Sequence, residues 1–127
     1  MAEIKKDRYY VESHEWILFE DDIAYIGISD YAQEELGDIV YVESEGEDEE
    51  FEKGEIFGSV ESVKMASDLY MPVDGIILEF NEKLTDEPEL INEDSYENWI
   101  VKIKATNLAQ QNDLLDVKEY QAIIDEE

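Results

Sequence analysis

Short β-rich runs separated by turn residues dominate the sequence and limit its fold. Runs at 16–19 and 23–28 flank the turn cluster Glu20-Asp21-Asp22, a pattern typical of a hairpin. Further runs lie at 39–42, 55–60, 76–80 and 99–104. The pattern gives about eight short strands, and no segment has the spacing of a βαβ unit. The chain is therefore predicted to be mainly β.

Two helices are expected to interrupt this β pattern. The segment from Ser29 to Gly37 is predicted to be a short helix. The Ser29 hydroxyl can accept from an otherwise unpaired amide, and Gly37 supplies the left-handed residue after the last turn. Asp116 and Glu119 match a capping box, in which side chains and backbone amides pair reciprocally. A C-terminal amphipathic helix is therefore expected from about residue 116.

The segments between these elements are interpreted mostly as irregular or extended backbone. They are an exposed bend at 13–15, a solvated acidic loop at 43–50, a turn at 85–88 and a short extended piece at 90–92. We expect Trp16 and Trp99 to anchor the core, because large aromatic side chains are usually well buried.

The composition limits the chain to one domain with few kinds of chemistry. Its 127 residues suffice for one core, so 1–127 is predicted to be a single domain. There is no cysteine and one histidine, His14, which excludes thiolate nucleophiles and multi-histidine metal sites. With 36 acidic and 9 basic residues, the formal net charge of −27 opposes binding to nucleic acid or to anionic membranes. Partners with basic docking faces are favoured.

The N-terminal segment bears on the compartment. It lacks the apolar centre of a signal peptide and contains the acidic residues that transit peptides lack. No apolar run reaches transmembrane length. We therefore expect a cytoplasmic location, and we expect a monomer.

One lysine stands apart in this acidic chain. Lys64 is the only Lys or Arg between Lys53 and Lys83. An apolar strand at 56–60 precedes it and the strand at 76–80 follows it, so Lys64 is predicted to lie at the tip of a hairpin. A lone amine on a rigid tip can be singled out by a modifying enzyme. Lys64 is therefore the candidate attachment point for a prosthetic arm.

The stretch around Lys64 carries a specific pattern. It reads Glu61-Ser62-Val63-Lys64-Met65-Ala66-Ser67-Asp68, followed by Pro72-Val73-Asp74-Gly75. Further landmarks are His14-Glu15-Trp16, Gly27 to Gln33, Leu36 to Val40, Phe57-Gly58, Leu90-Ile91-Asn92 and Trp99-Ile100. Together they resemble the glycine cleavage system H-proteins over nearly the whole chain. Met65 and Met71 stand where that family usually has Ala and often has Ser, and 95–99 lacks the family's Pro and Gly.

The resemblance implies a lipoyl/biotinyl-type barrel-sandwich hybrid with the lysine on a tight turn. It implies a carrier without catalytic residues or a metal, with lipoate attached covalently to Lys64. The arm would take an aminomethyl group at the P-protein, deliver it at the T-protein and pass electrons to the L-protein, dihydrolipoamide dehydrogenase. A lipoate-attaching enzyme would recognise the turn with the help of Glu61 and Asp68.

The resemblance also implies a surface groove in which the loaded arm rests. The positions expected to line it are Ser13, His14, Glu15, Tyr31 and Asp68. The carboxylates of Glu15 and Asp68 suit a cationic aminomethyl group. Purely structural roles are the alternative. Residues 13–15 can form a turn in which backbone groups hydrogen-bond to the His14 side chain, and Glu61 and Asp68 can be ordinary carboxylates of the hairpin surface.

Three other functions are alternatives to a lipoyl carrier of glycine cleavage. A biotinyl carrier domain has methionines beside its lysine, and Met65 supplies half of that match. A lipoyl relay would hand its group to 2-oxoacid dehydrogenase subunits instead of serving glycine cleavage. A hydrolase with paired carboxylates would need buried acids at a fixed separation, whereas the acids here cluster in loops.

Overall fold

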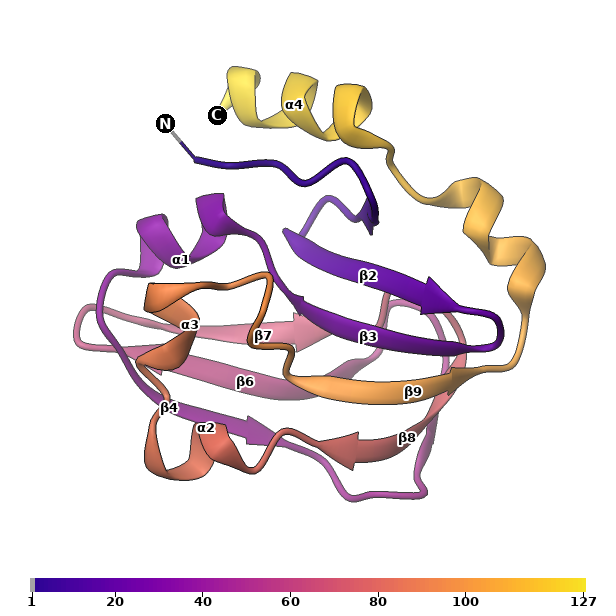
Figure 1. Ribbon diagram of the computed structural model, residues 1–127, viewed down its shortest axis with the longest axis horizontal. Helices are drawn as coiled ribbons and strands as arrows, with labels where there is room; N and C mark the ends of the chain where they lie inside the picture. Colours follow the sequence, from indigo (N-terminus) through magenta and orange to yellow (C-terminus); the bar gives the residue numbers. More distant parts are fainter. Residues whose placement is uncertain (1) are drawn as a thin grey trace.

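Residues 2–127 are described by a computed structural model, in which two antiparallel sheets face each other across an apolar core (Figure 1). The larger sheet has the order β1 (Tyr9–Tyr10), β2 (Glu15–Glu20), β3 (Ile23–Ile28), β9 (Val101–Ala105), β8 (Gly75–Phe80) and β5 (Glu50–Phe51). The smaller sheet has the order β4 (Ile39–Ser44), β6 (Ile56–Ser62) and β7 (Ala66–Tyr70). This architecture confirms the predicted mainly β barrel-sandwich class.

Short helices join and cover the sheets. They are α1 (Asp30–Leu36), α2 (Lys83–Asp86), α3 (Leu90–Glu93), the 3₁₀ helix η1 (Leu108–Asp113) and α4 (Val117–Glu126). The predicted caps of α1 are present, because the Ser29 hydroxyl accepts from Ala32 N at 3.2 Å and Gly37 has a φ of 80°. The predicted capping box of α4 is also present, between Asp116 and Glu119.

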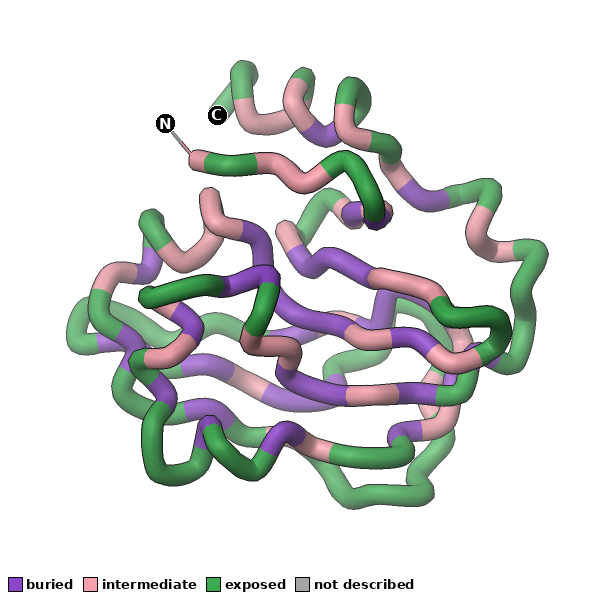
Figure 2. The backbone as a smooth tube through the Cα atoms, viewed as in Figure 1, coloured by how far each residue is buried: buried purple, intermediate pink, exposed green. Residues whose placement is uncertain are grey.

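Two groups of buried side chains hold the molecule together. The larger fills the space between the sheets, where the strand centres are buried and most connections are exposed (Figure 2). The smaller is aromatic and lies where α4 crosses the N-terminal segment: its buried members are Tyr10, Trp16, Tyr96 and Tyr120. The rings of Tyr10 and Tyr120 stack with centroids 4.5 Å apart. This contact fixes α4 beside the N-terminal segment.

The small sheet depends on one close backbone approach. A Cβ on Gly58 in β6 would lie 2.2 Å from the carbonyl oxygen of Glu43 in β4. Only glycine allows β4 and β6 to come this close. The ladders on either side of β6 are irregular, between Ile39 and Tyr41 and between Ile56 and Gly58. β6 is the central strand of the small sheet, between β4 and β7.

The hairpin that ends at Lys64 has a different second strand from the one predicted. β6 pairs with β7, Ala66–Tyr70, whereas the strand at 75–80 belongs to the other sheet and pairs with β9 and β5. The segment 66–70 contains Ser67 and Asp68, which disfavour a strand by composition. Its pairing with β6 and the burial of Leu69 outweigh that preference.

Several of the smaller predictions were wrong. Residues 90–92 are helical because α3 buries Ile91 and its Asn92 side chain donates to Gly37 O and accepts from Ile39 N. Residues 83–86 form α2, so the turn predicted at 85–88 begins inside a helix. The acidic segment 43–50 is a loop only in its middle, because β4 continues to Ser44 and β5 begins at Glu50. Trp16 is buried as expected, but Trp99 is only half-buried and precedes β9.

Candidate functional site

Lys64 lies at the tip of the β6–β7 hairpin, as predicted, and its side chain is exposed. The turn is closed by a hydrogen bond from Ser62 N to Met65 O of 2.8 Å. The Ser62 hydroxyl accepts from Lys64 N at 3.2 Å and from Met65 N at 3.1 Å. The side chain of Ser62 thus satisfies the amides that such a tight turn leaves unpaired. The backbone that carries Lys64 is therefore ordered by its own sequence.

A second set of contacts ties the tip to the end of α1. Val63 N donates to Asp38 O at 3.0 Å. The stem of Lys64 lies over Gly37, where a Cβ would come within 3.2 Å of Lys64 Cε. The left-handed glycine that ends α1 therefore leaves the space through which the lysine stem passes. The tip and α1 lie on the same side of the molecule (Figure 1).

The amine of Lys64 is not engaged in the ion pairs of residues 2–127. Those pairs join Lys5 to Glu3, Arg8 to Asp7, His14 to Glu127 and Lys53 to Asp113. An exposed amine without an ion-pair partner remains available to another molecule. Lys64 can therefore be modified without breaking a salt bridge of the described chain.

A cavity of about 190 Å³ opens beside the hairpin, and here it is named the arm cavity. Met65 in the turn and Ser67 and Asp68 in β7 reach its rim, within about 10 Å of one another along the backbone. Its apolar wall consists of Ile28, Ala32, Leu36, Val60 and Leu69. Its polar wall consists of Ser13, His14, Glu15, Tyr31, Glu35 and Glu127. The lining of the cavity thus combines apolar side chains with carboxylates.

Glu15 is the buried carboxyl group of the arm cavity. Its side chain is almost fully buried at the start of β2, with 1% exposure, so the exposed bend predicted at 13–15 does not extend to it. Burial raises the pKa of Glu15 to about 7, although hydrogen bonds donated by the Ser13 hydroxyl and Tyr70 N oppose this rise. The carboxyl group can therefore change its charge near neutral pH, inside the cavity.

A hydrogen-bonded chain joins the cavity to the C-terminal helix. The hydroxyl of Tyr120 is hydrogen-bonded to His14 Nδ1 at 2.7 Å and to Ser29 Oγ at 2.6 Å. His14 Nε2 lies 3.2 Å from Glu127 Oε2, and the Tyr31 hydroxyl donates to the other carboxylate oxygen, Oε1, at 3.3 Å. The left-handed φ of 78° at His14 is held by these contacts and by the bond from His14 N to Val11 O. The end of α4 thus forms one edge of the cavity.

The structure brings all five predicted groove residues together and leaves one other predicted site residue apart. Ser13, His14, Glu15, Tyr31 and Asp68 all line the arm cavity. Glu61 does not: it is exposed on the outer face of the small sheet, opposite Tyr41. Sequence reasoning missed the apolar wall and Glu127. The spacing of Ala32 and Leu36 on α1 could have indicated part of that wall, whereas nothing in the sequence indicates Glu127.

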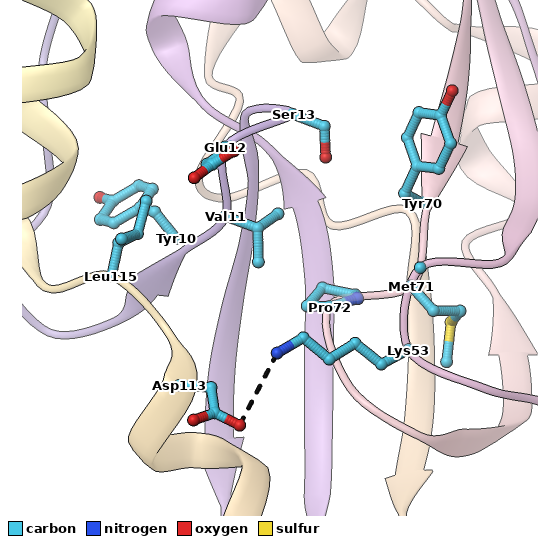
Figure 3. A pocket seen from close by; sticks show the side chains of 11 residues that line it. Tyr10, Val11, Glu12, Ser13, Lys53, Tyr70, Met71, Pro72, Asp113 and Leu115 are labelled. Carbon is cyan, nitrogen blue, oxygen red and sulfur yellow. Dashed lines mark ion pairs between the residues drawn. The ribbon is translucent and has the colours of Figure 1, made fainter.

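A larger cavity of about 460 Å³ has Ser13 and Tyr70 in its lining (Figure 3). Lys53 extends across it toward Asp113, with 3.8 Å between the charged atoms. Its walls are mainly Tyr10, Val11, Met71, Pro72 and Leu115. Ser13 lines both cavities. Cavity size alone therefore does not identify the site, because Glu15, Asp68 and Met65, the residue after Lys64, line the smaller cavity.

Other kinds of site find no support in the described residues. Within residues 2–127 no group of three or more His, Asp or Glu side chains could hold a metal ion. In the same part of the chain no helix is both long and apolar enough to cross a membrane. The functional features that remain are an exposed lysine and the cavity next to it.

The fold and the site define a carrier domain: one addressable lysine on an ordered β-turn, beside a cavity that can receive whatever the lysine holds. The glycine cleavage H-protein family model matches residues 8–127. The chain belongs to the glycine cleavage H-protein family.

Known proteins agree with this assignment over most of their length. The glycine cleavage system H protein of Clostridioides difficile is 54% identical over 114 residues, covering 89% of this chain and 91% of that protein. The glycine cleavage system H protein of Bacteroides fragilis is 50% identical over 116 residues, covering 91% of this chain and 92% of that protein. The crystal structure of a glycine cleavage system H protein from Mycobacterium marinum superposes with a TM-score of 0.86, at 36% identity, and covers 94% of this chain and 97% of that one.

Proposed function

We propose that this protein is the lipoyl carrier of a glycine cleavage system, with the lipoyl group joined to Lys64 by an amide bond. The observation that carries the proposal is an exposed, unpaired Lys64 on an ordered turn directly beside a cavity that contains Glu15 and Asp68. Membership of the H-protein family supports it. We also propose that 1–127 acts as one cytoplasmic, monomeric carrier domain that is not itself an enzyme.

The residues present fit such an arm. When bound, the lipoyl group supplies a disulfide that can take up an aminomethyl group and two electrons. The Ser62 turn holds the base of the arm in one orientation, while the four-carbon stem of Lys64 provides reach. Tethering raises the effective concentration of the arm at each partner. The lysine therefore contributes position, and the chemistry belongs to the group and the partner enzymes.

We propose that the arm cavity shelters the loaded arm between visits to its partners. The apolar wall suits the hydrocarbon part of the arm, and Glu15 and Asp68 suit a cationic aminomethyl group. An ammonium ion near Glu15 would favour its ionised form, against the burial that raises its pKa. Ser13 would hold the Glu15 carboxyl in place through its hydrogen bond. His14 and Tyr31, tied to Glu127, would form the rim.

We propose three partners of the cycle and one modifying enzyme. The P-protein would load the arm from glycine, the T-protein would unload it, and the L-protein, dihydrolipoamide dehydrogenase, would reoxidise it. A lipoate-attaching enzyme would install the group, with Glu61 and Asp68 on either side of the turn. The formal net charge of −27 favours partners with basic docking faces.

Peptide mass spectrometry of the protein from its own cells tests the assignment. The peptide that spans residues 54–83 contains Lys64 as its only internal lysine, so a lipoyl mass increment there is unambiguous. We expect that increment in cells supplied with lipoate. An unmodified Lys64 under these conditions, or a biotinyl increment, would contradict the proposal.

A further inference from the structure

Exposed apolar side chains gather around Lys64. Burial of such groups is the main favourable term in folding, so several together on a surface indicate contact with another molecule. Those nearest the lysine are Val40 (51% exposed), Tyr41 (47%), Val63 (68%) and Met65 (52%). They make up four of the seven large apolar residues that the described chain leaves exposed. The arm cavity accounts only for Met65.

Backbone contacts place β4 directly beside the hairpin tip. Val63 N donates to Asp38 O at 3.0 Å, and Ile39 pairs with Ser62. The ladder is irregular between Ile39 and Tyr41. Such a bulge bends the strand and changes where side chains point, so Val40 and Tyr41 are both exposed. The tip of the hairpin and the start of β4 therefore form one surface.

Carboxylates frame this surface. Glu61 stands opposite Tyr41 in the ladder, and directly paired residues share a face of a sheet. The Tyr41 hydroxyl donates to Glu43 at 3.2 Å. The pKa of Tyr41 is raised mainly by the negative charge of Glu43 and by the hydrogen bond to it. Slight desolvation and the charge of Glu61 contribute less.

We infer that this surface, named the Tyr41 face (Val40, Tyr41, Glu43, Glu61, Val63 and Met65), is where the lipoate-attaching enzyme docks. The inference rests on the proposed function, since it presupposes that Lys64 is lipoylated. An enzyme that acts on Nζ must contact the hairpin tip, and these side chains surround it. The matching partner surface has an apolar pocket for Tyr41 and Lys or Arg side chains at its rim.

The modification itself needs only the lysine amine from this chain. The unprotonated Nζ of Lys64 attacks the carboxyl carbon of lipoate, which is activated as an adenylate made from ATP. The new C–N bond forms as the acyl–phosphate bond breaks, AMP departs, and the nitrogen loses a proton. Tyr41 and the carboxylates act through docking and touch no reacting atom. Their removal should therefore raise KM for the protein substrate without changing kcat.

The test compares Tyr41→Ala with Ile56→Ala in lipoylation by a purified lipoate ligase with lipoate and ATP. Ile56 is the matched control because it is 49% exposed and lies at the opposite end of β6 from the tip. Intact mass follows the modification of the full-length protein, and thermal unfolding checks that each variant is folded. We expect Tyr41→Ala to raise KM about tenfold at unchanged kcat, which is a typical effect for an aromatic side chain central to an interface. Ile56→Ala should match the wild type.

The charged part of the face is tested separately. The double variant Glu43→Gln, Glu61→Gln should raise KM about threefold at low salt and should weaken the dependence of KM on salt, because screening then has fewer charges to act on. Wild-type KM values in both Tyr41→Ala and the double variant would overturn the inference. A defect confined to glycine cleavage by the lipoylated variants would also overturn it, by assigning the face to an enzyme of the cycle. Failure of the wild type to gain a lipoyl group at Lys64 would instead overturn the proposed function.

Discussion

The tip of the β6–β7 hairpin and the arm cavity beside it are built in opposite ways. The tip consists of neighbouring residues, and its turn is closed by Ser62 and Met65. The cavity collects side chains from β2, β3, α1, β6, β7 and the last residue of the chain. One region is exposed and locally ordered, while the other is partly buried and depends on packing. Changes at the tip should therefore affect mainly function, whereas changes in the cavity wall should affect stability more strongly.

The largest effect is expected at the tip. Lys64→Arg keeps the positive charge but removes the amine that can form the amide, so lipoylation and glycine cleavage should both be abolished. The free energy of unfolding should change by less than about 0.5 kcal/mol, because the side chain is exposed. Intact mass, reconstituted glycine cleavage and urea unfolding measure the three quantities. Lys53→Arg is the control and should remain fully modified at Lys64. Residual cleavage by Lys64→Arg would refute the carrier role of this lysine.

The next effect is expected in the cavity, as a dependence of stability on pH. The pKa of Glu15 is about 7 in the folded protein and about 4.5 when unperturbed, so the folded state holds this proton more tightly. Its contribution to stability is complete below pH 4.5 and is lost as the pH rises through 7. Relative to Glu15→Gln, which does not titrate, the wild type should lose up to about 3 kcal/mol over this range.

Urea unfolding of the wild type and Glu15→Gln between pH 4.5 and 8 measures this loss. Glu35→Gln is the matched control, because Glu35 lines the same cavity but is exposed, and its pH profile should parallel the wild type. Parallel profiles for Glu15→Gln as well would show that Glu15 titrates alike in the folded and unfolded states. The cavity would then lack the buried acid on which the comparison depends.

A smaller effect is expected where α4 meets the cavity. Tyr120→Phe keeps the stacked ring but removes the hydroxyl that is hydrogen-bonded to His14 and Ser29. The free energy of unfolding should fall by about 1 to 2 kcal/mol, because His14 Nδ1 loses its partner. Tyr9→Phe is the control, since the Tyr9 hydroxyl bonds to no residue within 2–127. Equal effects of the two substitutions would show that the hydroxyl chain does not stabilise the cavity.

The smallest effect is expected within the turn itself. Ser62→Ala removes the oxygen that accepts from Lys64 N and Met65 N, while the bond from Ser62 N to Met65 O remains. Stability should fall by about 1 kcal/mol or less, because water can reach these amides at an exposed tip. Urea unfolding of this variant and of Ser59→Ala, on the same strand, provides the measurement. If Ser62→Ala lost more stability than Tyr120→Phe, the tip would depend on its hydrogen bonds more than the cavity does, which would contradict the proposed difference between the two regions.

Features that depend on neighbouring residues could be predicted from the sequence. The caps of α1 and α4 follow from Ser29, Gly37, Asp116 and Glu119, because each cap is a hydrogen bond or a backbone angle within one turn. The exposed position of Lys64 follows from the turn residues around it and from its isolation among acids. The resemblance to H-proteins rests on the same kind of contiguous motif.

The errors concern segments whose conformation is decided by distant partners. Strand β7 was missed because Ser67 and Asp68 are poor strand residues, and only the pairing with β6 makes the segment extended. Residues 90–92 looked extended, yet α3 is held by the contacts of Asn92 with Gly37 and Ile39. The burial of Glu15 was missed because nothing adjacent to it in sequence covers it.

The sequence alone determined where the amine of Lys64 is exposed, because a turn is stabilised by hydrogen bonds between residues that are close together along the backbone. Tertiary packing alone decided what lies next to that amine. Glu127 reaches His14 only because Tyr120 docks α4 against Tyr10, and Asp68 faces the same cavity only because β7 joins the small sheet. Such contacts join residues as far as 113 positions apart, from His14 to Glu127, and their energy comes from burial that no local pattern records.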